Sequence, residues 1–341
     1  MSHQTVSNQQ AAVIGAGSWG TALAVLLAKK GIKVRLWGRD PHHVSRLIDE
    51  QVNQKYLPGV KLPENLLPVM DLGEAVQGCR YVVMAIPSHG YRHVFFDLFP
   101  QLSKESLVLS AAKGIEDGSH LTMTKIMADV AQSVEDKRFG VLSGPSFAQE
   151  VATGQPTAVT VAFSEMEAAV EVQELLSTSL FRVYSSTDVT GVEICGAVKN
   201  IIAIAAGISE GLGFGLNARA GLVTRGLAEI TRLGVTMGGS IATFSGLAGL
   251  GDLVLTCTGN LSRNRTVGLK LGQGKTLEAA LEEIGQVAEG VKTTKSCFTL
   301  RKELNVEMPI IEQVYAILYE GRGCAEVVRE LFQRDLRAEG P

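Results

Sequence analysis

The chain of 341 residues has no excess of charge of either sign, because 32 lysines and arginines face 35 aspartates and glutamates, leaving a formal net charge of −3. Proteins that bind nucleic acids or anionic membrane surfaces usually carry a clear basic excess on the binding domain. The charge balance therefore argues against a nucleic-acid partner and against stable membrane association.

Paired cysteines and long apolar runs are also lacking. The five cysteines are odd in number, widely spaced and free of any C-x-x-C pair, which argues against a disulfide framework and a zinc site. The most apolar stretch, Ile201–Ile208, falls far short of the ~18 residues needed to cross a bilayer. Met1–Gln10 is polar and lacks the regions of a secretory signal. We therefore expect residues 1–10 to be disordered and the protein to be cytoplasmic.

Glycine is the one residue type in clear excess, with 37 among 341 residues, against an average share of about 7%. No collagen period or low-complexity run accounts for these glycines. We expect them at turns and at places where the backbone approaches a ligand.

The first half of the chain alternates short apolar runs with amphipathic stretches, a pattern typical of a parallel sheet covered by helices. Small, glycine-rich or polar residues follow five of these runs, at 15–17, 38–39, 86–88, 113–114 and 143–146. In an open α/β sheet, ligands bind at the edge where the strands end. The expected strands are Ala11–Ile14, Val34–Trp37, Tyr81–Ala85, Leu107–Ser110, Phe139–Leu142, Ala158–Phe163 and Phe181–Tyr184.

Strand signals stop near Gly191, and helical periodicity with frequent glycines takes over. The later helices are expected at Thr276–Ile284, Val291–Leu304 and Pro309–Tyr319. We therefore predict an α/β protein of two domains: a Rossmann-type domain with a mostly parallel sheet over residues 1–190 and an all-helical, substrate-binding domain over residues 191–341. Because no proline- or serine-rich linker separates them, the active site should lie between the two.

The segment Gly15–Gly20 reads GAGSWG, follows an expected strand and opens the expected helix Thr21–Lys30. The G-x-G-x-x-G spacing permits a tight turn and close approach of a pyrophosphate, which the N–H groups at the helix N-terminus then bind. The alternative is an ordinary glycine-rich turn. The preceding strand, the following helix and the early position favour a dinucleotide site.

The end of the second expected strand bears on which dinucleotide is bound. NAD sites usually place an acid there for the ribose 2′-hydroxyl, whereas NADP sites place an arginine near the 2′-phosphate. Here Arg39 precedes Asp40 and Pro41, and an aspartate before proline is typical of a helix N-cap. We therefore expect Arg39 to favour NADPH, with NADH accepted. The alternatives are that Arg39 is a solvated turn residue and that Asp40 serves NAD.

Lys199 stands out within an apolar stretch that is expected to be helical. Buried, unpaired lysines are rare, so its side chain either reaches solvent or faces a polar cavity. Near a nicotinamide, its ammonium could donate a proton to a carbonyl oxygen, because desolvation and a second cation, for which Lys113 is the candidate, both lower the pKa of a lysine. Its neighbours three and four places away on a helix cannot pair with it: Cys195, Gly196, Ile202 and Ala203.

Asp252 follows Gly251, and a polar stretch with Ser262, Arg263 and Asn264 comes soon after. A guanidinium with neutral donors around it suits a phosphate or carboxylate. The alternative is a helix capped by Ser262 with surface arginines. His89 and His93 have the spacing of metal ligands on one helix face, but no third ligand is evident, and we expect no metal.

Over nearly its whole length the sequence resembles NAD(P)-dependent glycerol-3-phosphate dehydrogenases of the bacterial type. The resemblance implies reduction of dihydroxyacetone phosphate to sn-glycerol 3-phosphate, a precursor of phospholipids, by a homodimer. The matching motifs are Tyr56–Gly59, Ile86–His89, Lys113–Glu116, Leu142–Ala148, Val198–Asn200, Gly246–Leu253, Ser262–Arg265, Ala288–Val291 and Glu307–Ile310.

The resemblance also implies the roles of individual residues, with Lys199 as the catalytic acid and base. Around the substrate it implies Lys113, Gly144, Ser146, Lys199, Asn200, Asp252, Ser262, Arg263 and Asn264. Around the cofactor it implies Ser18, Trp19, Arg39, Lys113, Ala148, Arg263, Val287 and Glu289, beside Gly15, Gly17 and Gly20 of the fingerprint.

Two departures from the family pattern lie outside the site. Asn305 replaces an expected glycine, and asparagine tolerates the left-handed conformation; Cys324-Ala325 stands where proline is expected. Two rival hypotheses are a related 6-phosphogluconate or β-hydroxyacid dehydrogenase and a non-catalytic NADP-binding redox sensor. The SRN and KGIE runs at Ser262 and Lys113 argue against the first, and the intact Lys113, Lys199 and Asp252 argue against the second.

Overall fold

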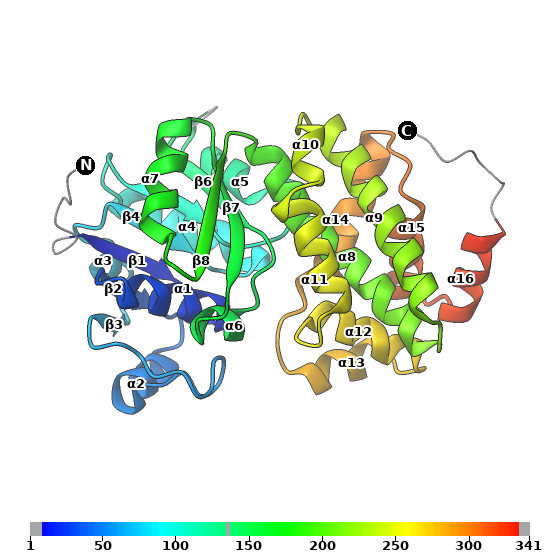
Figure 1. Cartoon of the computed structure of the whole chain (residues 1–341), viewed down its shortest axis with the longest axis horizontal. Coiled ribbons are helices and arrows are strands. Elements are labelled where there is room, and N and C mark those ends of the chain that lie inside the picture. The colour runs from blue at the N-terminus through cyan, green and yellow to red at the C-terminus, as the bar shows by residue number, and fades with distance from the viewer. Residues whose placement is uncertain (1–8, 134–136, 334–341) are drawn as a thin grey trace.

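The computed structural model describes residues 9–133 and 137–333, which form an α/β half and a helical half side by side (Figure 1). Of the ten N-terminal residues predicted to be disordered, 1–8 lie outside the described residues. Gln10 belongs to the first strand, so the prediction is wrong for this residue. Gln10 adds one residue to β1 before the apolar run, because it pairs with Lys33 on the neighbouring strand.

The α/β half is built on one sheet of eight strands in the order β3-β2-β1-β4-β5-β6-β7-β8. Every neighbouring pair is parallel except β6 and β7, which run antiparallel. The predicted mostly parallel sheet is therefore confirmed. The strands are β1 (Gln10–Ile14), β2 (Lys33–Trp37), β3 (Leu66–Val69), β4 (Tyr81–Met84), β5 (Leu107–Ser110), β6 (Phe139–Ser143), β7 (Thr157–Phe163) and β8 (Phe181–Ser186).

Helices cover both faces of this sheet, and β1 shows how its residues divide between them. Ala11 and Val13 join the core beneath α1, α6 and α7, whereas Ala12 and Ile14 join the core on the opposite face, beneath α3, α4 and α5. The alternation of side chains along a strand produces this division. The helices of this half are α1 (Ser18–Lys29), α2 (Pro41–Glu50), α3 (Leu72–Val76), α4 (Ser88–Leu98), the 3₁₀ turn η2 (Phe99–Gln101), α5 (Met123–Val130), α6 (Ala148–Ala152) and α7 (Met166–Leu176).

One strand escaped prediction. β3 lies at the edge of the sheet, contains Pro68 and leaves Leu67 exposed. Proline has no N–H group to donate to a neighbouring strand, so within sheets it is confined to edge positions or bulges. With a proline and no clean alternation, these four residues carry no strand pattern that the sequence could reveal.

The helical half surrounds a long buried helix, α8, whose side chains form the centre of a second core. By length and composition α8 could cross a membrane, but 94% of its most apolar window is buried inside the protein. A second apolar segment, the 18 residues Ile241–Thr258, is 39% buried and is divided among α10, η3 and α11. The elements are α8 (Val189–Gly211), α9 (Leu216–Thr236), α10 (Ile241–Phe244), the π turn η3 (Leu247–Gly251), α11 (Asp252–Thr258), α12 (Arg263–Gly272), α13 (Leu277–Ile284), α14 (Glu289–Glu303), α15 (Pro309–Tyr319) and α16 (Cys324–Phe332).

Glycines let α8 and α12 pack with their backbones in contact. A Cβ added to Gly207 would lie 2.0 Å from the carbonyl oxygen of Arg265, and one added to Gly268 would lie 1.9 Å from that of Ile204. Such distances exclude any side chain at either position. Glycines of the helical half therefore allow its helices to pack closely.

The three later helices were predicted to within two residues at each end. Asn305, after α14, has a φ of 54°, which confirms the expected left-handed conformation. Helices alone follow β8 in the described residues, as predicted. The domain boundary at 190/191 remains a prediction, and α8 begins two residues before it.

Candidate active site

The glycine-rich segment joins β1 to α1, as the sequence predicted. Gly15 has a φ of +121°, in the region that favours glycine, and a Cβ on Gly20 would lie 1.9 Å from the carbonyl oxygen of Gly15. A Cβ on Gly17 would instead meet no described atom within 4 Å. Gly15 and Gly20 are thus required by the turn itself, whereas Gly17 borders open space.

The N-terminus of α1 has no side chain that caps its N–H groups, since Gly17 occupies the N-cap position and the first turn contains no acid. Ser18 and Trp19 form the first residues of the helix and are half-buried. An uncapped helix N-terminus is suited to an anionic ligand such as a pyrophosphate.

The end of β2 has the predicted cap. The Asp40 carboxylate accepts a hydrogen bond from His42 N at 3.0 Å, with Pro41 as the first residue of α2. Arg39 is exposed. Partial burial and the charge of Lys292 lower the pKa of His89, and the charge of Arg39 lowers it further. Arg39 is therefore near enough to His89 for its charge to act on the imidazole.

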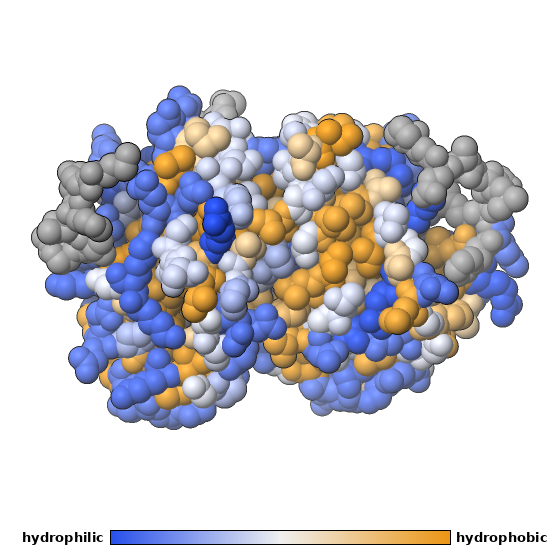
Figure 2. Space-filling model, in the orientation of Figure 1, coloured by the Kyte–Doolittle hydropathy of each residue, from blue (hydrophilic) through white to orange (hydrophobic). Residues whose placement is uncertain are grey.

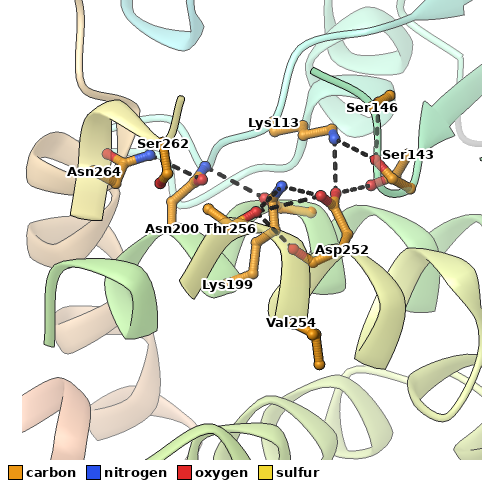
Figure 3. Close-up of polar contacts among 12 residues, drawn as sticks. Lys113, Ser143, Ser146, Lys199, Asn200, Asp252, Val254, Thr256, Ser262 and Asn264 are labelled. Atoms are coloured by element: carbon orange, nitrogen blue, oxygen red, sulfur yellow. Dashed lines mark hydrogen bonds and ion pairs between the residues drawn. The ribbon is translucent and has the colours of Figure 1, made fainter. Parts of the chain in front are cut away.

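Two lysines from different halves of the molecule meet at one carboxylate (Figure 3). Lys199 on α8 forms an ion pair with Oδ1 of Asp252, the first residue of α11, and Lys113 after β5 forms one with Oδ2 at 2.7 Å. Lys199 and Asp252 are buried, and Lys113 is half-buried. The partner that Lys199 lacks on its own helix is thus supplied by α11, and the side chain does not reach solvent.

Two residues that the sequence did not single out complete this cluster. Lys199 Nζ donates to Thr256 Oγ1 at 2.8 Å, and Ser143 Oγ donates to Asp252 Oδ2 at 3.5 Å. Thr256 lies four places after Asp252 on the same helix, so helical spacing could have identified it. Ser143 is the last residue of β6, in one of the loops at the strand ends where ligands were expected.

The environment changes the pKa values of both buried groups. Burial is the main reason why the pKa of Lys199 is lowered to about 7; the charge of Asp252 opposes this shift, and the charge of Lys113 adds to it. For Asp252 burial acts to raise the pKa, but the charges of Lys113 and Lys199 outweigh it and the pKa is lowered. The cluster therefore contains a lysine that can exchange a proton near neutral pH.

The segment after β6 lies beside the lysines. Lys113 Nζ donates to the carbonyl oxygen of Gly144 at 3.1 Å, and Ser146 Oγ donates to the same oxygen at 2.9 Å. Gly144 has a φ of +138°. Ala148 begins α6 and packs against the core that also contains the buried side chains of α1.

A second cluster forms around the N-terminus of α12. Ser262 caps this helix by accepting from Arg265 N at 3.2 Å, so the capping alternative is correct for its side chain. Asn264 Nδ2 donates to Asn200 Oδ1 at 2.9 Å, which connects α12 to the helix of Lys199 (Figure 3). Arg263 is exposed and its closest described partner is Gln286, at 3.5 Å.

Arg265 differs from Arg263 although the two are close in sequence. It is buried, and its guanidinium donates two hydrogen bonds to the Glu210 carboxylate, at 2.9 and 2.7 Å. This pair joins α12 to the end of α8. Of the two arginines, only Arg263 keeps its charge available to a ligand.

Glu289 connects the helical half to the end of β4. Its carboxylate accepts from Ser88 Oγ at 2.5 Å and from Ser88 N at 3.2 Å, at the N-terminus of α4. Val287, two residues earlier, is partly exposed. Ser88 belongs to the Ile86–His89 motif, from which no role of its own is predicted. The predicted cofactor residues thus lie along the strand ends and across the boundary between the halves.

The histidines considered as metal ligands lie on α4. His93 pairs with Asp97 at 3.7 Å, and both side chains are exposed. Within residues 9–133 and 137–333, no group of three or more histidine, cysteine, aspartate or glutamate side chains is arranged to hold a metal ion.

Comparison with known proteins gives a consistent result. The family model described as NAD-dependent glycerol-3-phosphate dehydrogenase N-terminus matches residues 10–169, and the corresponding C-terminus model matches residues 188–329. A glycerol-3-phosphate dehydrogenase (NAD(P)+) from Desulfotalea psychrophila is 55% identical over 331 residues, which cover 96% of this chain and 98% of that protein. The protein of the same name from Citrifermentans bemidjiense is 54% identical over 97% of this chain and 99% of its own length.

Solved structures agree with the sequence comparisons. A glycerol-3-phosphate dehydrogenase from Coxiella burnetii superposes with a TM-score of 0.92 and 44% identity, over 96% of this chain and 99% of that one. A glycerol-3-phosphate dehydrogenase from Saccharomyces cerevisiae gives a TM-score of 0.81 at 28% identity, over 96% and 99% of the two chains.

Proposed function

The chain belongs to the NAD-dependent glycerol-3-phosphate dehydrogenase family, and on that basis we infer that it reduces dihydroxyacetone phosphate to sn-glycerol 3-phosphate with NAD(P)H. The reaction is reversible and supplies the glycerol phosphate backbone of phospholipids. The observation that supports the chemistry most directly is the buried Lys199, held between Asp252 and Thr256 with its pKa lowered to about 7.

The residues at the end of β1 fit a dinucleotide. The open space beside Gly17 and the uncapped N-terminus of α1 suit a pyrophosphate. The reduced nicotinamide of the bound cofactor supplies the hydride that reaches the carbonyl carbon of the substrate. We assign Gly15, Gly17, Ser18, Trp19 and Gly20 to this cofactor.

Lys199 is the general acid in this proposal. Its ammonium donates a proton to the carbonyl oxygen as the carbon accepts hydride, and the resulting neutral amine takes a proton from solvent. In the oxidation the amine removes the hydroxyl proton. Asp252 holds the ammonium in place, and Lys113 places a second positive charge beside the oxygen, which stabilises the negative charge that develops there.

The phosphate of the substrate is assigned to the cluster at the start of α12. Arg263 offers an exposed guanidinium, and the N-terminus of the helix adds main-chain donors. Asn264 and Asn200, hydrogen-bonded to each other, lie between this cluster and Lys199. A phosphate held here would orient the substrate so that its carbonyl oxygen meets the lysine.

The remaining predicted residues receive roles consistent with their positions. Gly144 and Ser146 lie on the side of Lys113 and are assigned to the substrate. The predicted division into a dinucleotide-binding domain, 1–190, and a substrate-binding domain, 191–341, stands as part of the same proposal. Ala148, Val287, Glu289 and Arg263 are assigned to the cofactor.

One assay tests the proposed function. Purified protein is mixed with NADPH, and the loss of NADPH absorbance is followed with and without dihydroxyacetone phosphate. We expect oxidation of NADPH only with this substrate. In the opposite direction, we expect no reduction of NADP⁺ with 6-phosphogluconate or a β-hydroxyacid. Binding of NADPH without turnover of any substrate would favour the redox-sensor hypothesis instead.

We assign the preference for NADPH to Arg39. The residue is exposed at the end of β2, close enough to lower the pKa of His89, and Asp40 is already engaged as a helix cap. A 2′-phosphate would give Arg39 the anionic partner that none of the described residues supplies as a salt bridge. NADH, which lacks that phosphate, should be accepted with lower efficiency.

A homodimer and a cytoplasmic location complete the proposal. Exposed large apolar side chains, among them Leu216, Ile241 and Val254, lie on α9, α10 and α11, and Figure 2 shows apolar surface over this face of the helical half. Val254 points away from the site (Figure 3). Light scattering should give the mass of two chains, and Val254→Asp should reduce it to one if this face forms the interface.

A further inference from the structure

Asn53 is a buried polar residue that does not belong to the proposed site. It lies between α2 and β3, and none of its surface is exposed to solvent. Its side-chain Nδ2 donates to the carbonyl oxygen of Ala16 at 3.0 Å and to Thr21 Oγ1 at 2.8 Å, while Oδ1 accepts from Tyr56 N at 3.2 Å. The amide therefore uses both of its donor hydrogens on the glycine-rich turn and on the helix that follows it.

Ala16 is the residue between the first two glycines of the fingerprint. Its carbonyl oxygen receives a second contact from His43 Nε2 on α2, at 3.3 Å. Burial lowers the pKa of His43, although the hydrogen bond to Ala16 acts to raise it. Because a carbonyl oxygen can only accept, Nε2 is the donor in this contact. Two donors from a later part of the chain thus hold one carbonyl of the turn.

The direction of this carbonyl determines where the next N–H group points. In a trans peptide the C=O and the following N–H lie on opposite sides of a rigid plane. Because Asn53 holds the Ala16 oxygen toward the protein, the N–H of Gly17 is turned away from it, toward the open side of the turn. That side is where the pyrophosphate is proposed to bind.

We propose that Asn53, assisted by His43, is a positioning residue that holds the glycine-rich turn in its ligand-binding shape before the cofactor arrives. Glycines leave a turn free to adopt many conformations, and affinity is lost when binding must order them. Asn53 therefore acts on cofactor affinity and leaves the proton transfer at Lys199 unchanged. The inference rests on the proposed assignment of Gly15–Gly20 to a dinucleotide.

The opposite end of α1 offers a matched control. Asn65 Nδ2 donates to the carbonyl oxygens of Ala28 and Ile32, both at 2.8 Å. Like Asn53, Asn65 donates two hydrogen bonds at one end of this helix, although both of its acceptors are main-chain oxygens. It lies at the end away from the glycine-rich turn, so its loss affects the fold but not the proposed cofactor site.

The experiment compares Asn53→Leu with Asn65→Leu in the full chain. Dissociation constants for NADPH are measured by calorimetric titration, melting temperatures by circular dichroism, and kcat at saturating NADPH and dihydroxyacetone phosphate. We expect Asn53→Leu to raise the dissociation constant about tenfold, with kcat changed by less than about twofold. Asn65→Leu should lower the melting temperature and leave the dissociation constant unchanged.

Equal weakening by both variants, or an unchanged affinity in Asn53→Leu, would overturn the inference. If Asn53→Leu does not fold, His43→Phe carries the test, because the ring keeps its edge contact with Tyr56 and loses the donor to Ala16; an affinity about threefold weaker is then expected, and no change overturns the proposal. Failure of the unaltered protein to bind NADPH would instead overturn the proposed function.

Discussion

The two ends of the candidate site carry positive charge in different environments, although burial lowers the pKa of both cations. Lys199 is buried beside Asp252 and Lys113, whereas Arg263 is exposed at the start of α12. Burial brings the pKa of the lysine to about 7, and a guanidinium remains charged at any ordinary pH. The difference suits the roles proposed for the two residues. A side chain that donates a proton must be able to lose it, whereas a side chain that binds a phosphate must keep its positive charge.

The largest effect is expected from removing the acid itself. Lys199→Met keeps most of the side-chain volume and removes the ammonium, so reduction should slow by about a thousandfold. Binding of NADPH, measured by titration, should persist because the glycine-rich turn is untouched. Turnover near the normal rate would show that another group donates the proton.

The carboxylate between the lysines comes next. Asp252→Asn removes the charge that raises the pKa of Lys199, so less of the lysine is protonated at neutral pH and kcat/KM for reduction should fall by about a hundredfold. The rate should recover partly at lower pH. Ser143→Ala, which removes only a 3.5 Å contact with the same carboxylate, is the control and should change little.

At the exposed end, loss of charge should affect binding. Arg263→Ala should raise KM for dihydroxyacetone phosphate by about tenfold or more, with a smaller change in kcat. Unphosphorylated dihydroxyacetone has no phosphate for Arg263 to bind. The variant and the unaltered protein should therefore reduce it at the same low rate. If KM for the phosphorylated substrate stays the same, Arg263 does not bind the phosphate.

The unaltered protein should show the buried lysine in its pH profile. Reduction needs the charged form of Lys199, so kcat/KM should be constant below a pH of about 7 and should fall about tenfold for each pH unit above it. Oxidation needs the neutral amine and should show the opposite trend. A reduction rate independent of pH between 6 and 9, roughly the range in which this lysine titrates, would contradict the assignment.

The smallest effect is expected at a third, exposed cation. Arg39→Ala should lower kcat/KM with NADPH by about tenfold and leave that with NADH within about twofold. The ratio of the two efficiencies is the measured quantity, because it cancels any change in the amount of active protein. An unchanged ratio would mean that Arg39 does not contact the 2′-phosphate.

Local patterns explain why much of the fold was predictable from the sequence. The strands from β4 to β8 are short apolar runs between turn residues, and each of these runs can be recognised as a strand from its own residues. β3 does not, because Pro68 and the exposed Leu67 interrupt its pattern. The antiparallel direction of β7 against β6 was also out of reach, since pairing direction depends on residues far apart in the chain.

The candidate site, like the fold, was predictable from the sequence only in part. Lys199 and Asp252 were both identified from their surroundings or from the family resemblance, but their ion pair joins α8 to α11 and no spacing in the sequence encodes it. Thr256 could have been found from its helical spacing. Asn53 could not, because its significance comes entirely from a contact with Ala16 made in the folded chain.

The glycine contacts between α8 and α12 have a consequence for substrate size. Lys199 belongs to the first helix, and Arg263 and Asn264 begin the second. With Gly207 and Gly268 seated against backbone oxygen, the helices cannot approach further, and any side chain there would spread them apart. In the proposed site, this fixed spacing of the two helices limits the distance that can separate the carbonyl group of a substrate from its phosphate.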